Sequence, residues 1–528
     1  MDTKALRQKI LDLAIRGKLV PQDPNDEPAS VLLEHIREQK KQMVKDGKLK
    51  PKDIKNDTII FNGDDNLHYE KFQDGTVRCI EDEIPFEVPE GWEWTRLSNI
   101  ASFSGGKTPS TSDKTYWGND VLWVTSKDMK TKYIESSLMM LSDLGAKQLQ
   151  IYPIGTLLMV VRSGILRHTL PLSILSYPAT INQDLKAINF YYNGITEYIY
   201  FCLKAFEKNI LQKYTKAGAT VENIEFNSFK NIILPIAPEK QMESITSKTN
   251  DIEKVFCSIN KSKNSLYHCI NNAKSKILDL AIRGKLVPQD PNDEPASALL
   301  ERIKSEKEKL IKQGKIKRNN KQSVIFKGDD NSYYEKIGNT VTCIDDEIPF
   351  ETPINWQWVR LGSTVEIERG GSPRPIKSYI TTDSSGINWI KIGDVDKEGK
   401  YITNTKEKIK PTGIKKSREV HPGDFLLTNS MSFGRPYISK IYGCIHDGWL
   451  VLRNSNVVFD INFLYYLLSS NCLYNQFVIK ASGSTVDNLN IDKVSSALIC
   501  LPPIKEQIKI VNQIEKIMRL IQPFEELL

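Results

Sequence analysis

Apolar side chains recur at alternating steps of three and four residues from Met242 to Leu280. This spacing is the heptad pattern of a coiled coil, in which one apolar seam packs against a partner helix. It predicts a helix from about Glu239 to Arg283, about 65 Å long at 1.5 Å per residue. Gly284 and Pro288 then end the helix. The predicted seam contains Ile245, Ile252, Phe256, Ile259, Leu266 and Ile270, interrupted only at Thr249 and Lys263.

A second seam of the same kind ends the chain, and it is only half as long. Its apolar positions are Ile510, Ile514, Ile517 and Ile521. The missing half is at the other end of the chain, where Leu6, Ile10 and Leu13 match Ala273, Ile277 and Leu280 at a constant spacing. Because an apolar stripe must be buried, we expect an antiparallel pair. The central helix forms one side, and the C-terminal and N-terminal helices lie end to end on the other.

Between these helices, short β-branched and aromatic runs alternate with Gly, Pro, Asn and Ser, as in α/β domains. Examples are VLWVT, LLMVV, INWIKI, FLLT and GWLVL, with helical stretches such as TEYIYFCLKAF and INFLYYLLSS. The pattern predicts an α+β chain with two globular α/β domains, separated by two long antiparallel coiled-coil helices in a pseudo-twofold circular repeat.

An unchanged copy of one segment supports this repeat: Lys9 to Ser30 returns as Lys276 to Ser297. Each copy continues through a Lys-rich helical segment, a GDDN turn, YEK, CIEDEIPFE or CIDDEIPFE, and WEWTRL or WQWVRL, and the copies then diverge. Near-identity is expected if both frames present the same surface to equivalent neighbours. A recent duplication is the alternative, but it would leave the domains equally similar. The predicted segments are the N-terminal helix with the first frame (1–91), the first domain (92–238), the central helix (239–284), the second frame (285–355), the second domain (356–504) and the C-terminal helix (505–528).

Composition narrows the class of protein. A chain of 528 residues is too long for one core. With 40% hydrophobic and 26% charged residues it is typical of a soluble globular protein. We expect a cytoplasmic protein, because the longest apolar runs fall far short of a membrane span and the N-terminus lacks the apolar core of a signal peptide. The eight cysteines are scattered singly, which predicts no metal site. A net charge of +7 permits a polyanionic partner.

Each domain contains three Gly-rich, basic, hydroxyl-bearing segments, which we call its first, second and third candidate loops. They are 104–114, 161–168 and 216–220 in the first domain, and 368–377, 428–436 and 480–485 in the second. Glycine lets backbone N–H groups approach phosphate, and Arg, Lys, Ser and Thr donate to nucleic-acid backbones and base edges. One such loop alone is more often a surface turn, but six at corresponding places favour DNA binding. The candidate DNA-binding residues are Ser104, Lys107, Thr108, Ser110, Lys127, Arg162, Ser163, Arg167, Lys216, Thr220, Arg369, Ser372, Arg374, Lys391, Asn429, Ser432, Arg435, Lys480 and Thr485.

No set of residues in the sequence predicts an active site. The string GGKT lacks the first glycine of a phosphate-binding loop, because position 101 is Ala. Leu501 and Ile504 flank Pro502 and Pro503, so the Asn/Asp-Pro-Pro-aromatic signature of amino-methyltransferases is missing. The acidic run 81–83 recurs at 345–347, but on the duplicated frame, where a surface or hinge role is favoured. We expect no catalytic residue and no cofactor bound by this chain.

The segment ILDLAIRGKLVPQDPNDEPAS, the GxTPS-like loop after WxWxRL and the LPPIKEQ lead into a heptad helix resemble the specificity subunit of Type I restriction-modification systems. The resemblance covers the whole chain. It implies two target recognition domains, each reading one half of a bipartite, gapped site on double-stranded DNA, with half-sites about one helical turn apart. It also implies two methyltransferase subunits, which carry S-adenosylmethionine, and restriction subunits, which use ATP and Mg²⁺; the specificity subunit itself is not catalytic. The second domain has GGSPRP where the first has GGKTPS, which leaves open whether Lys107 and Arg374 do equivalent work.

Two other classes of function remain open at this point. A self-sufficient DNA-binding regulator that dimerises through its coiled coil would bind DNA specifically as an isolated chain, with a symmetric footprint. A protein-interaction scaffold would show no salt-dependent affinity for DNA.

Overall fold

The computed structural model describes residues 2–216, 221–314, 323–396, 399–429, 433–454, 457–481 and 488–528. It divides into two compact units, Met1–Lys261 and Ser262–Leu528. Each unit combines helices with several small sheets, which confirms the α+β prediction. The described helices include none that is long and apolar enough to cross a membrane. The finer division into six segments stays a prediction.

The central helix is present as predicted: α9 spans Glu239–Ile282, 44 residues. Gly284 follows it in the left-handed region, with φ +67°, and the Lys285 N–H donates to the Leu280 carbonyl at 2.9 Å. A side chain at Gly284 would meet Pro353 Cγ at 2.4 Å, so glycine is required both by its φ and by this close approach. Gly17 repeats this ending after α1 (Thr3–Ile15), again with φ +67°.

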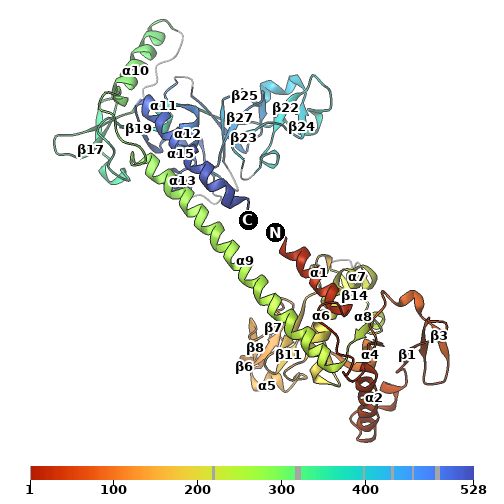
Figure 1. Ribbon diagram of the computed structural model, residues 1–528. Helices are drawn as coiled ribbons and strands as arrows, with labels where there is room; N and C mark the ends of the chain where they lie inside the picture. The colour runs from red at the N-terminus through yellow and green to blue at the C-terminus, as the bar shows by residue number, and fades with distance from the viewer. Residues whose placement is uncertain are drawn as a thin grey trace. The chain divides into compact units, whose positions relative to one another are not determined.

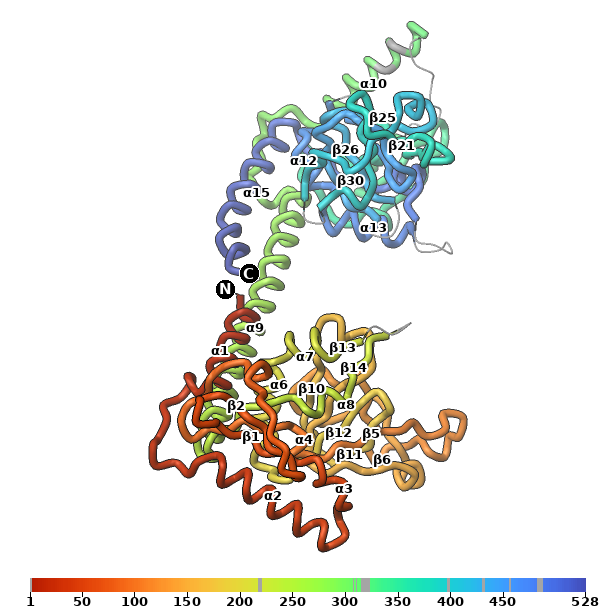
Figure 2. The backbone as a smooth tube through the Cα atoms, turned by 90° about the vertical axis from the view of Figure 1, so that its right-hand side faces the viewer, coloured from red at the N-terminus to blue at the C-terminus, as the bar shows by residue number. Residues whose placement is uncertain are grey.

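The two shorter seam helices run antiparallel to α9, each within its own unit (Figures 1 and 2). In the first unit, Thr3 of α1 hydrogen-bonds to Asn260, and Arg7 pairs with Glu253. In the second unit, Lys274 pairs with Glu525 of α15 (Ile504–Glu525). The predicted pairing of helix seams is therefore present on both stretches of α9.

Most predicted seam residues are buried or half-buried. Ile245, Phe256, Ile270, Ile510 and Ile514 are buried, and Ile252, Ile259, Leu266, Ile517 and Ile521 are half-buried. Thr249, the predicted polar interruption of the apolar seam, is buried within it, with only 1% of its surface exposed. Its hydroxyl donates to the Ile245 carbonyl at 2.7 Å, which satisfies the polar group inside the seam.

The predicted seam of α1 is rotated from the face that the structure buries. Leu6 is 36% exposed, and Ile10 and Leu13 are half-buried. The fully buried residues are Leu11, Ala14 and Ile15. The reason is a second neighbour, α6 (Thr196–Ala205), whose Ala205 carbonyl accepts from the Gln8 amide at 2.8 Å. Packing against both α9 and α6 moves the buried face of α1 toward the first domain.

The first domain is built on a five-stranded sheet and a three-stranded sheet. The first has the order β5-β12-β9-β10-β7, with bounds Ala101–Gly105, Leu185–Phe190, Leu157–Val160, Leu172–Leu175 and Tyr133–Ile134. The second has the order β11-β6-β8, with bounds Ala179–Ile181, Trp117–Val124 and Met139–Leu141. Strand β9 is buried throughout, and α6 and α7 (Glu207–Tyr214) contribute to the same core.

The second domain repeats this arrangement with two five-stranded sheets. One has the order β20-β29-β26-β27-β23, with bounds Glu366–Arg369, Trp449–Arg453, Phe425–Thr428, Pro436–Ser439 and Tyr401–Ile402. The other has the order β21-β24-β22-β28-β25, with bounds Ile380–Thr381, Glu407–Ile409, Ile387–Ile390, Gly443–Ile445 and Arg418–Val420. Helices α12 (Ile461–Leu468) and α13 (Asn471–Ala481) pack on this core.

Each frame consists of a long helix and a three-stranded antiparallel sheet. The helices are α2 (Ala29–Lys45) and α10 (Ala296–Lys312), and the sheets are β1-β2-β3 (Ile59–Asn62, His68–Lys71, Val77–Cys79) and β16-β17-β18 (Ser323–Lys327, Tyr333–Ile337, Thr340–Cys343). A tryptophan joins each frame to the start of a seam helix. Trp92 Nε1 donates to Gln241 at 2.8 Å, and Trp356 Nε1 donates to Glu506 at 2.9 Å. The frames thus repeat contacts as well as sequence.

A buried arginine network also recurs in both frames. Arg96 forms a double hydrogen bond with Glu70 (3.0 and 2.8 Å) and a third with Glu83 (2.7 Å). Burial opposes the charge of Glu70, but the hydrogen bonds from Arg96 and Thr58 outweigh it and lower its pKa to about 2. In the second frame Arg360 binds Glu335 at 2.7 Å and Glu347 at 2.8 Å. The acidic runs therefore include ligands of a buried guanidinium, whereas the sequence predicted a surface or hinge role for them.

Candidate nucleic-acid interface

The first candidate loop of the first domain is bound to the turn that follows β11. The Lys107 N–H donates to the Ile181 carbonyl at 3.0 Å, and the Thr108 hydroxyl hydrogen-bonds to the Gln183 side chain. A side chain on Gly106 would meet the Ile181 carbonyl oxygen at 2.0 Å. Glycine is required here because two backbone segments touch.

The second candidate loop meets the same turn. The Val161 N–H donates to the Asp184 carbonyl at 2.9 Å, which brings the second loop against the far side of the turn. The second loop in turn binds the segment that follows the third loop, since the Ser163 N–H donates to the Glu222 carbonyl at 3.1 Å. The first two loops of the first domain therefore meet around residues 182–184, and the segment after the third loop contacts the second. The composition of the sequence does not single out this turn.

In the second domain the first two loops meet the turn at residues 446–448 in the same way. The Gly371 N–H donates to the Ile445 carbonyl at 3.2 Å, and the Asn429 N–H donates to the Gly448 carbonyl at 3.0 Å. Leu489, after the third loop, donates to the Asn429 carbonyl at 2.9 Å. Three candidate residues, Thr220, Ser432 and Thr485, lie outside the described residues.

Strand register shows which positions of the two domains correspond. Gly105 is the partner of Lys186 in the first domain, and Arg369 is the partner of Leu450 in the second. With Lys107 bound to the end of β11 and Gly371 bound to the end of β28, Lys107 corresponds to Gly371, and counting on places Ser110 with Arg374. Lys107 and Arg374 are therefore not equivalent, although both lie on the first loop.

The candidate lysines that follow β6 and β22, Lys127 and Lys391, are not equivalent either. The Thr125 N–H donates to Asp128 at 2.8 Å, and the Lys391 N–H donates to Asp394 at 2.9 Å, so Lys391 corresponds to Thr125 rather than to Lys127. The two domains therefore share a backbone and place their positive charges differently.

The candidate cations divide into free and paired groups. Within the described ranges, no hydrogen bond or ion pair holds the exposed side chains of Lys107, Lys127, Arg162 and Arg369. The paired ones are Arg167 with Glu222, Lys216 with Glu225 (2.8 Å), Lys391 with Glu407 (2.6 Å) and Arg374 with Asp447 (3.9 Å). The free group is ready to neutralise phosphates without breaking an existing contact.

Some candidate residues support the fold instead of facing solvent. Asn429 is 1% exposed, and its amide donates to the Asp447 carbonyl at 2.9 Å, so it is unsuited to a direct DNA contact. Lys480 is half-buried near Arg360, and burial together with that charge lowers its pKa. Arg435 is half-buried, with its N–H bound to the Thr428 hydroxyl at 3.0 Å. Ser104, Ser163 and Ser372 are half-buried at the loop bases, and Ser110 is exposed.

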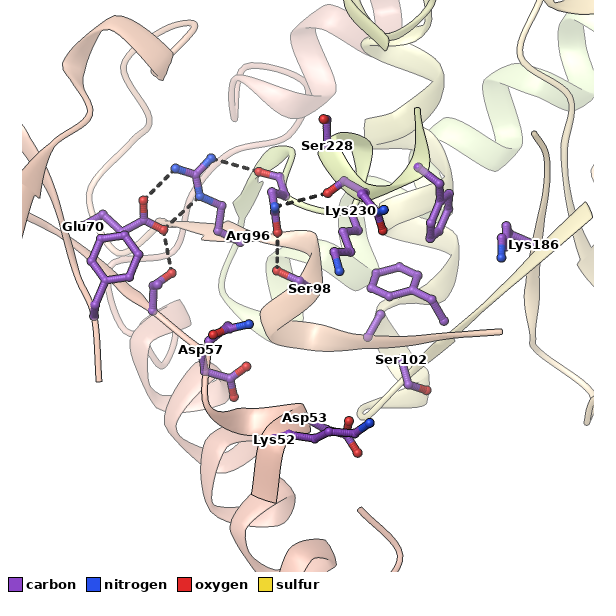
Figure 3. Close-up of a pocket in the computed structure, with 18 of the residues that line it drawn as sticks. Lys52, Asp53, Asp57, Glu70, Arg96, Ser98, Ser102, Lys186, Ser228 and Lys230 are labelled. Atoms are coloured by element: carbon purple, nitrogen blue, oxygen red, sulfur yellow. Dashed lines mark hydrogen bonds and ion pairs between the residues drawn. The ribbon is translucent and has the colours of Figure 1, made fainter. Parts of the chain in front are cut away.

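A cleft of about 1080 Å³ lies between the first frame and the first domain (Figure 3). Its walls carry both signs of charge: Lys52, Lys186, Lys213 and Lys230 against Asp53, Asp57 and Glu70. The Arg96 network forms part of the frame wall. The lining comes from the frame, β5, β12, the end of α7 and the segment 226–231. This mixed charge is typical of a junction between structural parts.

One cluster of potential metal-binding side chains occurs among the described residues, and spacing along the sequence did not reveal it. It consists of His68, Glu81 and Glu87 on the first frame, with His68 Nδ1 2.8 Å from Glu81. The second frame has Tyr333 in the place of His68, and its hydroxyl donates to Glu351 at 3.3 Å. The cluster lies outside the candidate loops, and the absence of a metal site stays a prediction.

The Gly106 contact gives a direct test of the loop geometry. We expect Gly106→Ala to lower the free energy of unfolding by about 1–3 kcal/mol, because the new methyl group overpacks the backbone of the turn. The Lys107 amide should also lose protection from hydrogen exchange. Gly164→Ala is the matched control, since an added Cβ there has nothing within 4 Å. Equal effects of the two substitutions would contradict the proposed contact.

Comparison with known proteins identifies the family. The model of the Type I restriction modification DNA specificity domain matches residues 89–275 and again 353–526. The EcoEI specificity subunit of Escherichia coli is 27% identical, over 97% of this chain and 88% of its own. The MjaIX specificity subunit of Methanocaldococcus jannaschii is 23% identical, over 79% and 84%. A solved chain described under "Structural basis underlying complex assembly and conformational transition of the type I R-M system" has a TM-score of 0.51 at 17% identity, covering 84% of this chain and 94% of that one, and so shares its fold. With two family matches that together cover most of its length, the chain belongs to the specificity subunits of Type I restriction-modification systems.

Proposed function

We propose that this chain reads an asymmetric, bipartite site on double-stranded DNA, with one half-site for each domain. In this proposal the duplicated frames dock two methyltransferase subunits, and restriction subunits join the assembly. The chain itself is not catalytic: S-adenosylmethionine, ATP and Mg²⁺ bind to the partners. The observation that carries the proposal is the shared arrangement of the first two loops around a turn, with different side chains in the two domains.

Two features support this reading over a symmetric regulator. The same backbone presents free cations at Lys107, Lys127 and Arg162 in one domain and at Arg369 in the other, so the two domains offer different surfaces to DNA. Two domains with different DNA-facing surfaces on one chain are expected to recognise half-sites of different sequence. The frames, by contrast, repeat the Arg96 network at Arg360, as expected of surfaces that meet identical partners.

A genome-wide map of methylated adenines, in cells with and without this gene, tests the proposal. We expect one asymmetric, gapped motif to disappear when the gene is deleted. The purified complex should also bind DNA with a log affinity that falls linearly with log salt, because bound Lys and Arg displace counterions. An unchanged methylome together with salt-independent DNA binding would favour the scaffold. A symmetric footprint of the isolated chain would favour the regulator.

A further inference from the structure

In each domain, one of the turns between its two sheets is a neighbour of both the first and the second loop. In the first domain it is Asn182-Gln183-Asp184, between β11 and β12. In the second it is His446-Asp447-Gly448, between β28 and β29. Register makes Gln183 and Asp447 equivalent, since each is the second residue after the strand end that binds the first loop.

The flanking residues of the first turn hold its shape. Asn182 is 6% exposed, and its amide donates to the Asp184 carboxylate at 3.1 Å, while the Asp184 N–H donates back to Asn182 at 3.2 Å. Gln183 lies between them with an exposed side chain. The Thr108 hydroxyl of the first loop hydrogen-bonds to its amide oxygen. The backbone of the turn is thus fixed, and its middle side chain faces solvent among the loops.

Different groups hold the second turn, and they also fix its shape. His446 Nδ1 accepts from the Gly448 N–H at 3.0 Å, and Nε2 lies 2.8 Å from Asp447 Oδ1. The Ser372 hydroxyl donates to the same oxygen at 2.7 Å, as Thr108 does to Gln183. Burial opposes the charge of Asp447, but the contacts with Ser372 and His446 keep its pKa below the ordinary range. Its second oxygen, Oδ2, lies 3.9 Å from Arg374.

We propose that Gln183 and Asp447 are specificity-determining residues that contact base edges in the major groove. This inference rests on the proposed function. A glutamine amide offers a donor and an acceptor together, the pair that matches N7 and N6 of adenine, and a carboxylate accepts from N4 of cytosine. Neighbouring loops supply the phosphate contacts that set the register of the duplex. Because the turns are held by backbone hydrogen bonds, each apex side chain needs little ordering on binding.

The test uses the full chain assembled with its methyltransferase partner, and it compares adenine methylation maps and competition binding to DNA duplexes altered at each position of the motif. Gln183→Ala should reduce discrimination about 5- to 150-fold at one base pair of one half-site only. Asp447→Asn, which turns an acceptor into a mixed donor and acceptor, should change one base pair of the other half-site only. Gln212→Ala, at an exposed glutamine on α7, is the matched control and should leave the motif unchanged.

Two results would overturn the inference: discrimination unchanged at every base pair in both variants, or a uniform loss at all positions of both half-sites, which indicates a structural role. The methylation map of the wild type distinguishes a failure of the proposed function from a failure of this inference alone. A missing gapped motif in the wild type counts against the proposed function, whereas a wild-type motif that both variants read unchanged counts against the role of the turn alone.

Discussion

Replacing Arg96 with methionine should lower the free energy of unfolding of the first unit by about 3–5 kcal/mol, because the change leaves the buried Glu70 carboxylate without its principal partner. The Arg96 side chain is 9% exposed and that of Glu70 is 3% exposed. Arg78→Met is the matched control. Arg78 contacts the same Glu70 oxygen at 2.9 Å, but its side chain is 56% exposed, so its loss should cost less than about 1 kcal/mol.

The pH dependence of the stability difference between wild type and Arg96→Met identifies the cause of that difference. The pKa of Glu70 is lowered from 4.5 to about 2 in the folded chain, so its contribution is complete above pH 4.5 and is lost as the pH falls toward 2. The gap between wild type and Arg96→Met should narrow over that range. Urea unfolding, with hydrogen exchange to assign the unit, measures it. A gap that does not change with pH would indicate that packing of the arginine stem, and not its charge, stabilises the frame.

The second large effect is expected in the helix seam of the second unit. Ile510 and Ile508 lie on the same helix, α15, with 0% and 48% of their surface exposed. Ile510→Ala should cost about 2–5 kcal/mol, since it removes buried carbons and leaves a cavity. Ile508→Ala should change stability by no more than about 0.5–1 kcal/mol. Hydrogen exchange in α15 measures the stability change in both variants. Similar losses of stability in the two variants would contradict the packing of Ile510 in the seam.

The helices could be predicted from the sequence because a heptad pattern is local. The prediction failed where a helix has two neighbours: α1 turns Leu11 and Ile15 inward because α6 packs beside it. Thr249 shows a related limit of the sequence pattern. Its polarity was visible in the sequence, but the 2.7 Å hydrogen bond that allows its burial was not.

The candidate loops were found from composition, but their common centre was not. The turn at 182–184 has no unusual composition, and its role depends on backbone hydrogen bonds to residues far away in the sequence, such as Lys107 and Val161. Aligning Gly105-Gly106 with Gly370-Gly371 by sequence shifts the two domains by one residue from the alignment that strand pairing gives. Gly105 is still a strand residue opposite Lys186, and its true counterpart is Arg369.

The way each turn is held has a consequence for inheritance. Backbone groups make the bonds from the turn to the first two loops, at Ile181 and Asp184 in one domain and at Ile445 and Gly448 in the other. Bonds of this kind do not depend on which side chain occupies the middle of the turn. A lineage could therefore replace the residue at 183 or 447 in a single mutational step without unfolding the domain. If these two residues read bases as proposed, descendants of one gene could then diverge in the DNA that they recognise while keeping the same partners.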